Sequence, residues 1–265
     1  MAAELAAAAA AWLDEEGHNV RVVVADAEAI PALARFAVDG LDGLDVAVSI
    51  GGDGTMLRAV RLVCRDGTPV LGINVGHLGY LTQVEPGDLI PALKRVLAGD
   101  FEVEERLTLD VFRTPGEEPV LALNDAVVEK LEAGHTVRVA VTVSNRPAIS
   151  YAADAVIVST PTGSTAYNLS AGGPIMSPRV RAMVVTPVAA HSLLGRSVVV
   201  AADEVVKVEV IDGTAVLGVD GQAQGHLEAG DSIECRVADH PARLVMFGEP
   251  EFWSVLKAKF GLSWD

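Results

Sequence analysis

Residues 46–55 have the sequence Val-Ala-Val-Ser-Ile-Gly-Gly-Asp-Gly-Thr, an apolar run that passes directly into a glycine-rich turn. A short β-branched run that ends in glycines predicts a buried parallel strand followed by a tight turn and a helix. At that edge of an open α/β sheet, peptide N–H groups and the helix N-terminus favour a bound anion, and glycine lets the backbone approach it closely. A carboxylate at Asp53 fits a partner of a metal ion or of an attacking hydroxyl better than a phosphate ligand.

A second polar signature lies far downstream. Residues 152–167 again form an apolar run, and it ends in a turn with five hydroxyl-bearing residues between Ser159 and Thr165. This is more than one turn needs for its own backbone. Taken alone, the first turn is also compatible with an Asp53 that only caps the next helix, because glycine-rich turns after strands are common. Two such turns in one chain indicate two walls of one site.

The charge balance excludes some partners. The 265 residues include 36 acids and 20 bases, a formal net charge of −16, whereas nucleic-acid binding needs a basic face. No stretch has the length of a membrane span, and the early alanine-rich run follows an acidic start, which predicts a surface helix and a cytoplasmic protein. The acid excess with few lysines indicates an archaeal-type, halophilic composition, although an acidic enzyme from a GC-rich genome has the same composition.

Cysteine and histidine spacing predicts no metal site built from side chains. Cys64 and Cys235 are too few and too far apart for a disulfide framework, and we expect both to be buried. The six histidines show no zinc-ligand spacing.

The hydrophobic pattern predicts two domains. Up to Gly99 we expect helices over 4–16, 30–38, 56–64 and 89–97 and strands over 20–24, 45–50 and 70–73. This alternation predicts an α/β domain over 1–99 with a doubly wound, mostly parallel sheet. Period-two alternation predicts a β-rich domain over 100–247, with strands within 101–112, 120–129, 136–144 and 198–219. In the segment 248–265 we expect a helix over 251–260 that packs back on the first domain through Phe252, Trp253 and Leu256.

Together the motifs resemble the NAD kinase family over nearly the whole chain. They are Gly-Gly-Asp-Gly-Thr at 51–55, Gly-His-Leu-Gly-Tyr-Leu at 76–81, Asn-Asp at 124–125, the run from Thr160 through Tyr167 to Ser170 and Gly172-Gly173-Pro174, and Asp-Gly-Gln at 220–222. Diacylglycerol kinases and phosphofructokinases carry similar GGDGT turns, so the Thr160–Tyr167 run with Asn-Asp upstream discriminates better. The resemblance implies phosphorylation of the adenosine-ribose 2′-hydroxyl of NAD, with ATP or polyphosphate as donor.

The resemblance also implies site residues, with Asp53 as the catalytic acid/base residue. The residues implied to contact substrate are Asp53, Gly54, Arg58, Asn124, Asp125, His135, Asp154, Thr165, Ala166, Tyr167, Asn168, Leu169, Ser170 and Gln222. Tyr167 would offer an aromatic face to a base, and Arg58, one turn into its helix, would face the phosphates. Mg²⁺ would accompany the phosphate donor. The family further implies a homodimer or homotetramer assembled through the β domain.

Other interpretations stay open at this point. A lipid or sugar kinase with the same turn would explain Asp53 but leave residues 165–170 without a role. A non-catalytic dinucleotide-binding module would leave an intact Asp53 without one. His135 is equally well explained as a surface residue. Asn124-Asp125 as a plain strand-end turn, or Tyr167 as a core residue, fits the neighbouring motif less well.

The start of the chain carries a further expectation. Doubly wound domains, and this family in particular, usually begin with an apolar strand, but Met1 leads directly into a predicted helix. In the usual winding that strand would lie between the strands over 20–24 and 45–50. Its absence would leave buried peptide groups unpaired there, each costing on the order of 1–3 kcal/mol. We therefore expect the natural start to lie upstream of Met1.

The acidic composition predicts a salt dependence. Mutual repulsion among acids should destabilise the fold at low ionic strength, and at molar salt the screening length shrinks to about 3 Å. Stability and activity should therefore rise with KCl concentration. Thermal melts and rate assays from low to molar KCl check this, and a flat or falling response would contradict the halophilic interpretation.

Overall fold

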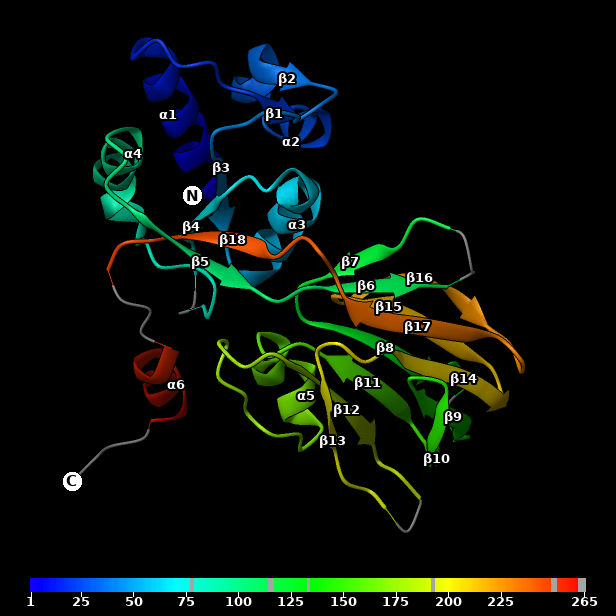
Figure 1. Ribbon diagram of the computed structural model, residues 1–265. Helices are drawn as coiled ribbons and strands as arrows, with labels where there is room; N and C mark the ends of the chain where they lie inside the picture. The colour runs from blue at the N-terminus through cyan, green and yellow to red at the C-terminus, as the bar shows by residue number, and fades with distance from the viewer. Residues whose placement is uncertain (77–78, 114–116, 133, 192–193, 249–251, 262–265) are drawn as a thin grey trace, which may run out of the picture. The chain divides into compact units, whose positions relative to one another are not determined.

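The computed structural model describes residues 1–76, 79–113, 117–132, 134–191, 194–248 and 252–261 (Figure 1). The chain divides into two compact units, one containing Met1–Glu105 and Ala242–Asp265 and the other containing Arg106–Pro241. No helix within these ranges is long and apolar enough to cross a membrane. His77 and Leu78, which belong to one of the quoted motifs, lie outside the described residues.

The first unit is built on a four-stranded sheet of order β3-β4-β18-β5 (Figure 1). Its strands are β3 (Ala47–Gly51), β4 (Val70–Asn74), β18 (Ala242–Met246) and β5 (Glu102–Arg106). Both β3 and β18 run parallel to β4. Every residue of β4 is buried, which is typical of a central parallel strand covered on both faces. The sheet confirms the predicted mostly parallel α/β architecture.

Helices cover this sheet, and three of the four predicted ones are present. They are α1 (Ala2–Glu15), α3 (Asp53–Val63) and α4 (Leu89–Leu97), with 3-10 turns η2 (Cys64–Asp66) and η3 (Pro86–Asp88). In α4 the buried residues are Leu89, Ala92, Leu93 and Val96, a spacing that places them on one helical face. They join Leu71, Ile73 and Val245 of the sheet and Ala9 of α1 in one apolar cluster.

Residues 20–38 differ from the prediction. Strand β1 (Val22–Val23) pairs only with β2 (Ala37–Val38) in a separate two-stranded sheet, and α2 (Val24–Ala29) and the 3-10 helix η1 (Pro31–Phe36) lie between them. The expected strand over 20–24 is reduced to Val22–Val23 outside the main sheet, and the expected helix over 30–38 is the 3-10 helix η1. The segment buries Ala27, Leu33 and Phe36 against Ala10 in a small cluster of its own. Burial in that cluster outweighs the strand propensity of the valines.

The position of β1 also changes the argument about the start of the chain. Strand β1 is not part of the main sheet, and β3 lies at the edge of that sheet. The expected gap between two buried strands is therefore not found among the described residues.

The second unit consists of two six-stranded antiparallel sheets. One has the order β10-β9-β14-β17-β6-β7 and the other β13-β12-β11-β8-β15-β16 (Figure 1). The strands of the first are β6 (Leu109–Phe112), β7 (Val120–Ala122), β9 (Val137–Val143), β10 (Arg146–Ala153), β14 (Val206–Asp212) and β17 (Ser232–Val237). Those of the second are β8 (Asp125–Lys130), β11 (Ala155–Ser159), β12 (Ala182–Val188), β13 (Val198–Ala201), β15 (Ala215–Val219) and β16 (Gln222–Leu227). The predicted β-rich domain is confirmed.

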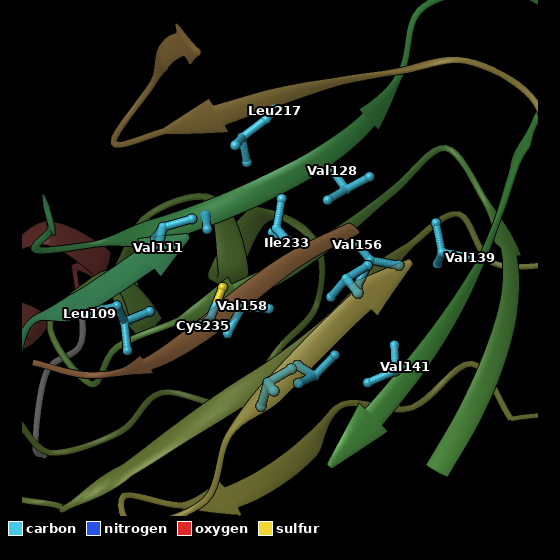
Figure 2. Packing of buried hydrophobic residues seen from close by; sticks show 14 of the residues in the cluster. Leu109, Val111, Val128, Val139, Val141, Val156, Val158, Leu217, Ile233 and Cys235 are labelled. Atoms are coloured by element: carbon cyan, nitrogen blue, oxygen red, sulfur yellow. The ribbon is translucent and has the colours of Figure 1, made fainter. Parts of the chain in front are cut away.

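Alternating valines from both sheets form the core of this unit. Val139 and Val141 of one sheet and Val156 and Val158 of the other belong to a single cluster (Figure 2). Cys235 lies in the same cluster, and burial, with a smaller contribution from Glu234, raises the pKa of its thiol to about 12. Cys64 is also buried. Both cysteines therefore behave as small apolar residues, as the sequence predicted.

The unit boundaries fall at 105/106 and 241/242, whereas the sequence pattern placed them at 99/100 and 247/248. The difference comes from β5 and β18, whose alternating patterns resemble those of the β-rich domain. Both strands complete the sheet of the first unit instead. The terminal helix α6 (Phe252–Phe260) also belongs to the first unit; Glu251, the first residue of the predicted helix, lies outside the described residues.

Candidate functional site

In the first unit, the glycine-rich turn joins β3 directly to α3. Strand β3 ends at Gly51, Gly52 is extended with φ −94° and ψ −170°, and Asp53 is the first residue of α3. Gly52 accepts the N–H bonds of Thr55 and Met56 through its carbonyl. A Cβ on Gly51 would overlap the side chain of Thr55, so this position requires glycine. The turn thus places a carboxylate at a helix N-terminus, where the macrodipole favours negative charge.

The carboxylate of Asp53 is held by a different segment of the chain. Its Oδ2 accepts the N–H of Tyr80 at 3.0 Å and its Oδ1 accepts the N–H of Leu81 at 3.1 Å. A Cβ on Gly79 would overlap Oδ1, so glycine is needed there for the segment to approach. The N-cap position of α3 belongs to Gly52, and Asp53 is the first residue inside the helix. A role as helix cap alone therefore does not account for the two bonds that the Asp53 carboxylate accepts from Tyr80 and Leu81.

Two polar side chains that sequence reasoning missed lie at the same edge of the sheet. Thr82 is buried beside Gly79, and its Oγ1 has no hydrogen-bond partner among the described residues. Asn74, the last residue of β4, donates from Nδ2 to Glu85 Oε1 at 3.2 Å, while its Oδ1 has no partner within the same ranges. Asn74 pairs with Gly51 in the parallel register, so its position at the end of a strand next to the turn was the available signal.

Arg58 and Gly54 lie on α3. Arg58 Nη1 is 2.6 Å from Asp26 Oδ1, and both side chains are about two-fifths exposed, at 41% and 43%. The arginine that was predicted to face phosphates is thus engaged with α2 in this structure. A Cβ added to Gly54 would lie in open space, so no steric constraint of the fold explains glycine at this position.

In the second unit, Asp220 organises the Asn124-Asp125 segment. Its carboxylate accepts the N–H groups of Leu123, Asn124 and Asp125 at 2.9, 2.7 and 3.2 Å. Asp220 and Gly221 both have positive φ, +47° and +75°, in the two-residue hairpin between β15 and β16. The Asp-Gly-Gln motif includes Asp220, but no role for its side chain was predicted. The Asp-Gly pair, which is typical of a hairpin turn, was the signal that could have indicated a structural role. Gln222, the first residue of β16, is exposed.

At this site, Asp125 has a pKa far from its ordinary value. Its side chain is 4% exposed. Burial, together with the charge of Asp220, raises the pKa of Asp125 from its ordinary 3.8 to about 7. The Asp220 carboxylate accepts three N–H bonds, and the neighbouring Asp125 takes up the proton. The site therefore holds a carboxylic acid that is partly neutral near neutral pH.

The hydroxyl-rich segment is fastened to Asn124. Thr160 donates its N–H to the Asn124 carbonyl at 2.8 Å and its hydroxyl to the Leu123 carbonyl at 2.6 Å. A Cβ on Gly163 would overlap the Asn124 backbone, so the two segments are in direct contact. The structure thus brings together the Asn124-Asp125 pair and the downstream turn.

Residues 165–170 divide into buried and exposed members. The 3-10 turn η4 (Gly163–Thr165) leads into the short helix α5 (Tyr167–Ser170). Asn168 is fully buried: its Nδ2 donates to the carbonyls of Ser164 and Pro174, both at 3.0 Å, and its Oδ1 accepts the hydroxyl of Thr186 at 2.6 Å. These bonds use the hydrogen-bonding capacity of its amide. The side chain of Asn168 therefore holds the segment in shape.

Tyr167, in contrast, is 37% exposed and lies among acids. Burial raises the pKa of its hydroxyl, and the charges of Glu129, Asp154 and Asp125 raise it further. Asp154 accepts a 2.6 Å bond from Lys130 Nζ. The structure thus groups Tyr167 with Asp125 and Asp154. His135 is exposed and lies 3.5 Å from Glu132, which is the arrangement of a surface residue.

The state of Asp125 predicts a pH dependence of stability. The folded chain holds this proton up to about pH 7, whereas an unfolded Asp loses it near its ordinary pKa of about 3.9. The folded state binds more protons between these values, so its free energy of unfolding should fall as the pH rises through them. Asp125→Asn lacks this effect, and its Tm relative to the unchanged protein should be higher at about pH 8 than at about pH 5.

Thermal melts of the free protein at the two pH values check this prediction. Asp203→Asn, which changes an exposed acid of the same unit, is the matched control and should shift Tm equally at both pH values. An equal shift for Asp125→Asn as well would contradict the assignment of the proton.

Comparison with protein families gives matches in both units. Residues 2–101 match the ATP-NAD kinase N-terminal domain, and residues 123–247 match the ATP-NAD kinase C-terminal domain. The NAD kinase of Heliobacterium modesticaldum is 42% identical over 264 residues, which cover 97% of this chain and 93% of the relative. That of Moorella thermoacetica is 42% identical over 254 residues, 92% and 81% of the two chains. Bacterial relatives dominate the matches and do not support the archaeal and halophilic interpretation.

Comparison with solved structures also finds kinases of NAD or NADH. A crystal structure of yeast NADH kinase complexed with NADH has a TM-score of 0.84 at 24% identity, covers 100% of this chain and 85% of its own, and shows the shared fold. An NAD kinase from Archaeoglobus fulgidus in complex with ATP has a TM-score of 0.70 at 27% identity, covering 90% and 95% of the two chains. With both family domains matched and 42% identity over nearly all of its length, the chain belongs to the NAD kinase family.

Proposed function

We propose that this chain phosphorylates the adenosine-ribose 2′-hydroxyl of NAD to give NADP, with Asp53 as the acid/base residue and ATP or polyphosphate as the donor. The observation that carries the proposal is the pair of peptide N–H bonds that fix the Asp53 carboxylate at the start of α3. Membership of the NAD kinase family supports the reaction. It disfavours the lipid or sugar kinase and the non-catalytic module.

The geometry of Asp53 suits a late proton acceptor. Both oxygens accept an N–H, which fixes the plane of the carboxylate and leaves lone pairs for a hydroxyl donor. A ribose hydroxyl is far less acidic than a carboxyl group, so Asp53 orients the hydroxyl rather than ionising it in advance. The hydroxyl oxygen attacks the terminal phosphorus of the donor, and the bond from that phosphorus to the bridging oxygen breaks. The proton passes to Asp53 as attack nears completion and then leaves to solvent.

Mg²⁺ fits this arrangement as a companion of the donor. Across the described ranges no three His, Cys, Asp or Glu side chains gather into a metal-binding group. Mg²⁺ is usually bound by one or two protein carboxylates together with phosphates and several waters. The Asp53 carboxylate, which keeps lone pairs beyond its two N–H bonds, would supply that ligand. When bound, the ion would neutralise part of the charge of the donor phosphates.

The second unit supplies the residues that we propose to hold the dinucleotide. Asn124 and Asp125 are positioned by Asp220, and Tyr167 offers a partly exposed ring beside Asp154. Ser170, Thr165, Ala166 and Leu169 belong to the same segment, whereas Asn168 contributes by holding that segment in shape. We also propose substrate contacts from Arg58, His135 and Gln222, and assembly of the chain into a homodimer or homotetramer.

An NADP formation assay tests the function directly. The purified chain is incubated with NAD, Mg²⁺ and either ATP or polyphosphate. NADP formation with either donor supports the proposal. Absence of NADP with both donors, together with measurable NAD binding, would instead favour the non-catalytic module.

Asp53→Asn should abolish most of the activity. The substitution keeps the size of the side chain but removes the proton acceptor, so kcat should fall by at least about a hundredfold with little change in KM for NAD. Steady-state kinetics check this, with Asp45→Asn, an exposed acid just before β3, as the matched control. A near-normal kcat for Asp53→Asn would contradict the mechanism.

Tyr167→Ala should weaken the binding of NAD rather than lower kcat. Loss of a ring that stacks on a base should weaken NAD binding by about 1–3 kcal/mol, whereas Tyr167→Phe, which keeps the ring, should bind normally. Calorimetric titration with NAD measures both. An unchanged dissociation constant for Tyr167→Ala would assign the ring to packing.

A further inference from the structure

One face of α6 lies on Tyr80. The ring centroids of Phe252 and Tyr80 are 6.4 Å apart, and Lys259 Nζ lies 4.4 Å from the centroid of the Tyr80 ring. Leu256, between them in sequence, is buried. Residues 252, 256 and 259 are spaced by four and three, so they share one helical face. Phe252 and Lys259 can therefore contact Tyr80 together only while the residues between them are helical.

Tyr80 is also the residue whose peptide N–H binds Asp53 Oδ2, and the next N–H, from Leu81, binds Oδ1. Burial raises the pKa of the Tyr80 phenol, and the charge of the Asp53 carboxylate raises that pKa further. One residue thus connects α6 with the carboxylate that the proposed reaction uses.

The segment that carries these two N–H groups has little regular structure of its own. Residues 79–82 lie outside the helices and strands. The backbone bonds that follow it in sequence are those of Gln83 and Val84 to the Gly72 carbonyl, at 3.4 and 3.3 Å, and that of the Asn74 N–H to the Val84 carbonyl, at 2.7 Å. Fixing such a backbone opposes its conformational entropy, so contacts from elsewhere must hold it. Among the described contacts, these are the bonds to Asp53, the burial of Leu81 and Thr82 against Gly72 of β4, and the face of α6 on Tyr80.

We propose that α6 is a positioning element for Asp53, with Phe252 and Lys259 holding Tyr80 and, through it, the two peptide N–H groups on the carboxylate. This inference rests on the catalytic role proposed for Asp53. Neither side chain is assigned a contact with substrate. Their effect should therefore appear in kcat and should require an intact Asp53.

The first arm of the test changes the two side chains. Lys259→Met removes a cation from an exposed ring contact and should lower kcat about twofold to fivefold. Phe252→Ala removes a packed ring and should lower kcat about tenfold or more, since small misplacements of reacting groups are costly. KM for NAD and ATP should stay nearly constant. Lys259→Arg keeps the cation over the ring and should restore kcat.

Matched controls come from the same helix. Lys257→Met and Phe260→Ala make the same chemical changes at positions without a ring contact to Tyr80 among the described residues, and both should leave kcat unchanged. Thermal melts show whether Phe252→Ala is folded. Lys259 is exposed, so Lys259→Met keeps the test valid if Phe252→Ala is not folded.

The second arm places each change in the Asp53→Asn background, with the residual rate measured at high enzyme concentration. If α6 acts through Asp53, the α6 substitutions should not lower kcat further. Losses that multiply in the double variants, a rise in KM instead of a fall in kcat, or an unchanged kcat for Lys259→Met and Phe252→Ala would each overturn the inference. A near-normal kcat for Asp53→Asn alone would overturn the proposed mechanism first and is distinguishable from these results.

Discussion

Both units rely on a carboxylate that accepts peptide N–H bonds from a segment far away in the sequence. Asp53 binds the N–H groups of residues 80 and 81, and Asp220 binds those of residues 123–125. Charge-assisted bonds of this kind are about twice as strong as neutral ones, and a buried N–H without a partner destabilises the fold. The loops that carry the candidate site residues therefore depend on two acids for their shape.

In the second unit, the carboxylate that accepts these N–H bonds also changes the pKa of a neighbouring acid. The Asp220 carboxylate accepts three N–H bonds, and its charge adds to the effect of burial in raising the pKa of Asp125 to about 7. In the first unit, the acid sits at a helix N-terminus with two donors. In each unit, backbone donors thus hold one carboxylate in place beside the candidate site residues.

Local patterns predicted the parts of the fold that depend on neighbours in sequence. The apolar run 46–50 and its glycines predicted β3, the turn and α3, because both periodicity and turn chemistry act over a few residues. They did not predict that Tyr80 and Leu81 bind Asp53, since pairing across the sheet edge depends on tertiary contacts. The valines at 20–24 were predicted to form a strand of the main sheet. Instead, this segment packs with Phe36 in a separate cluster, and its short strand β1 pairs only with β2. In the motif at 165–170, sequence alone could not separate the buried Asn168 from the partly exposed Tyr167.

Strand β18 lies between β4 and β5, although it follows the whole second unit in the chain. On the ribosome, the first unit is therefore synthesised first but lacks an interior strand of its sheet until residue 246 has emerged. The second unit, an uninterrupted run from 106 to 241, has all of its strands earlier. Domains of most proteins complete folding in the order of synthesis. The topology of this chain predicts the reverse order, in which the unit that carries Asp53 is the last to be completed.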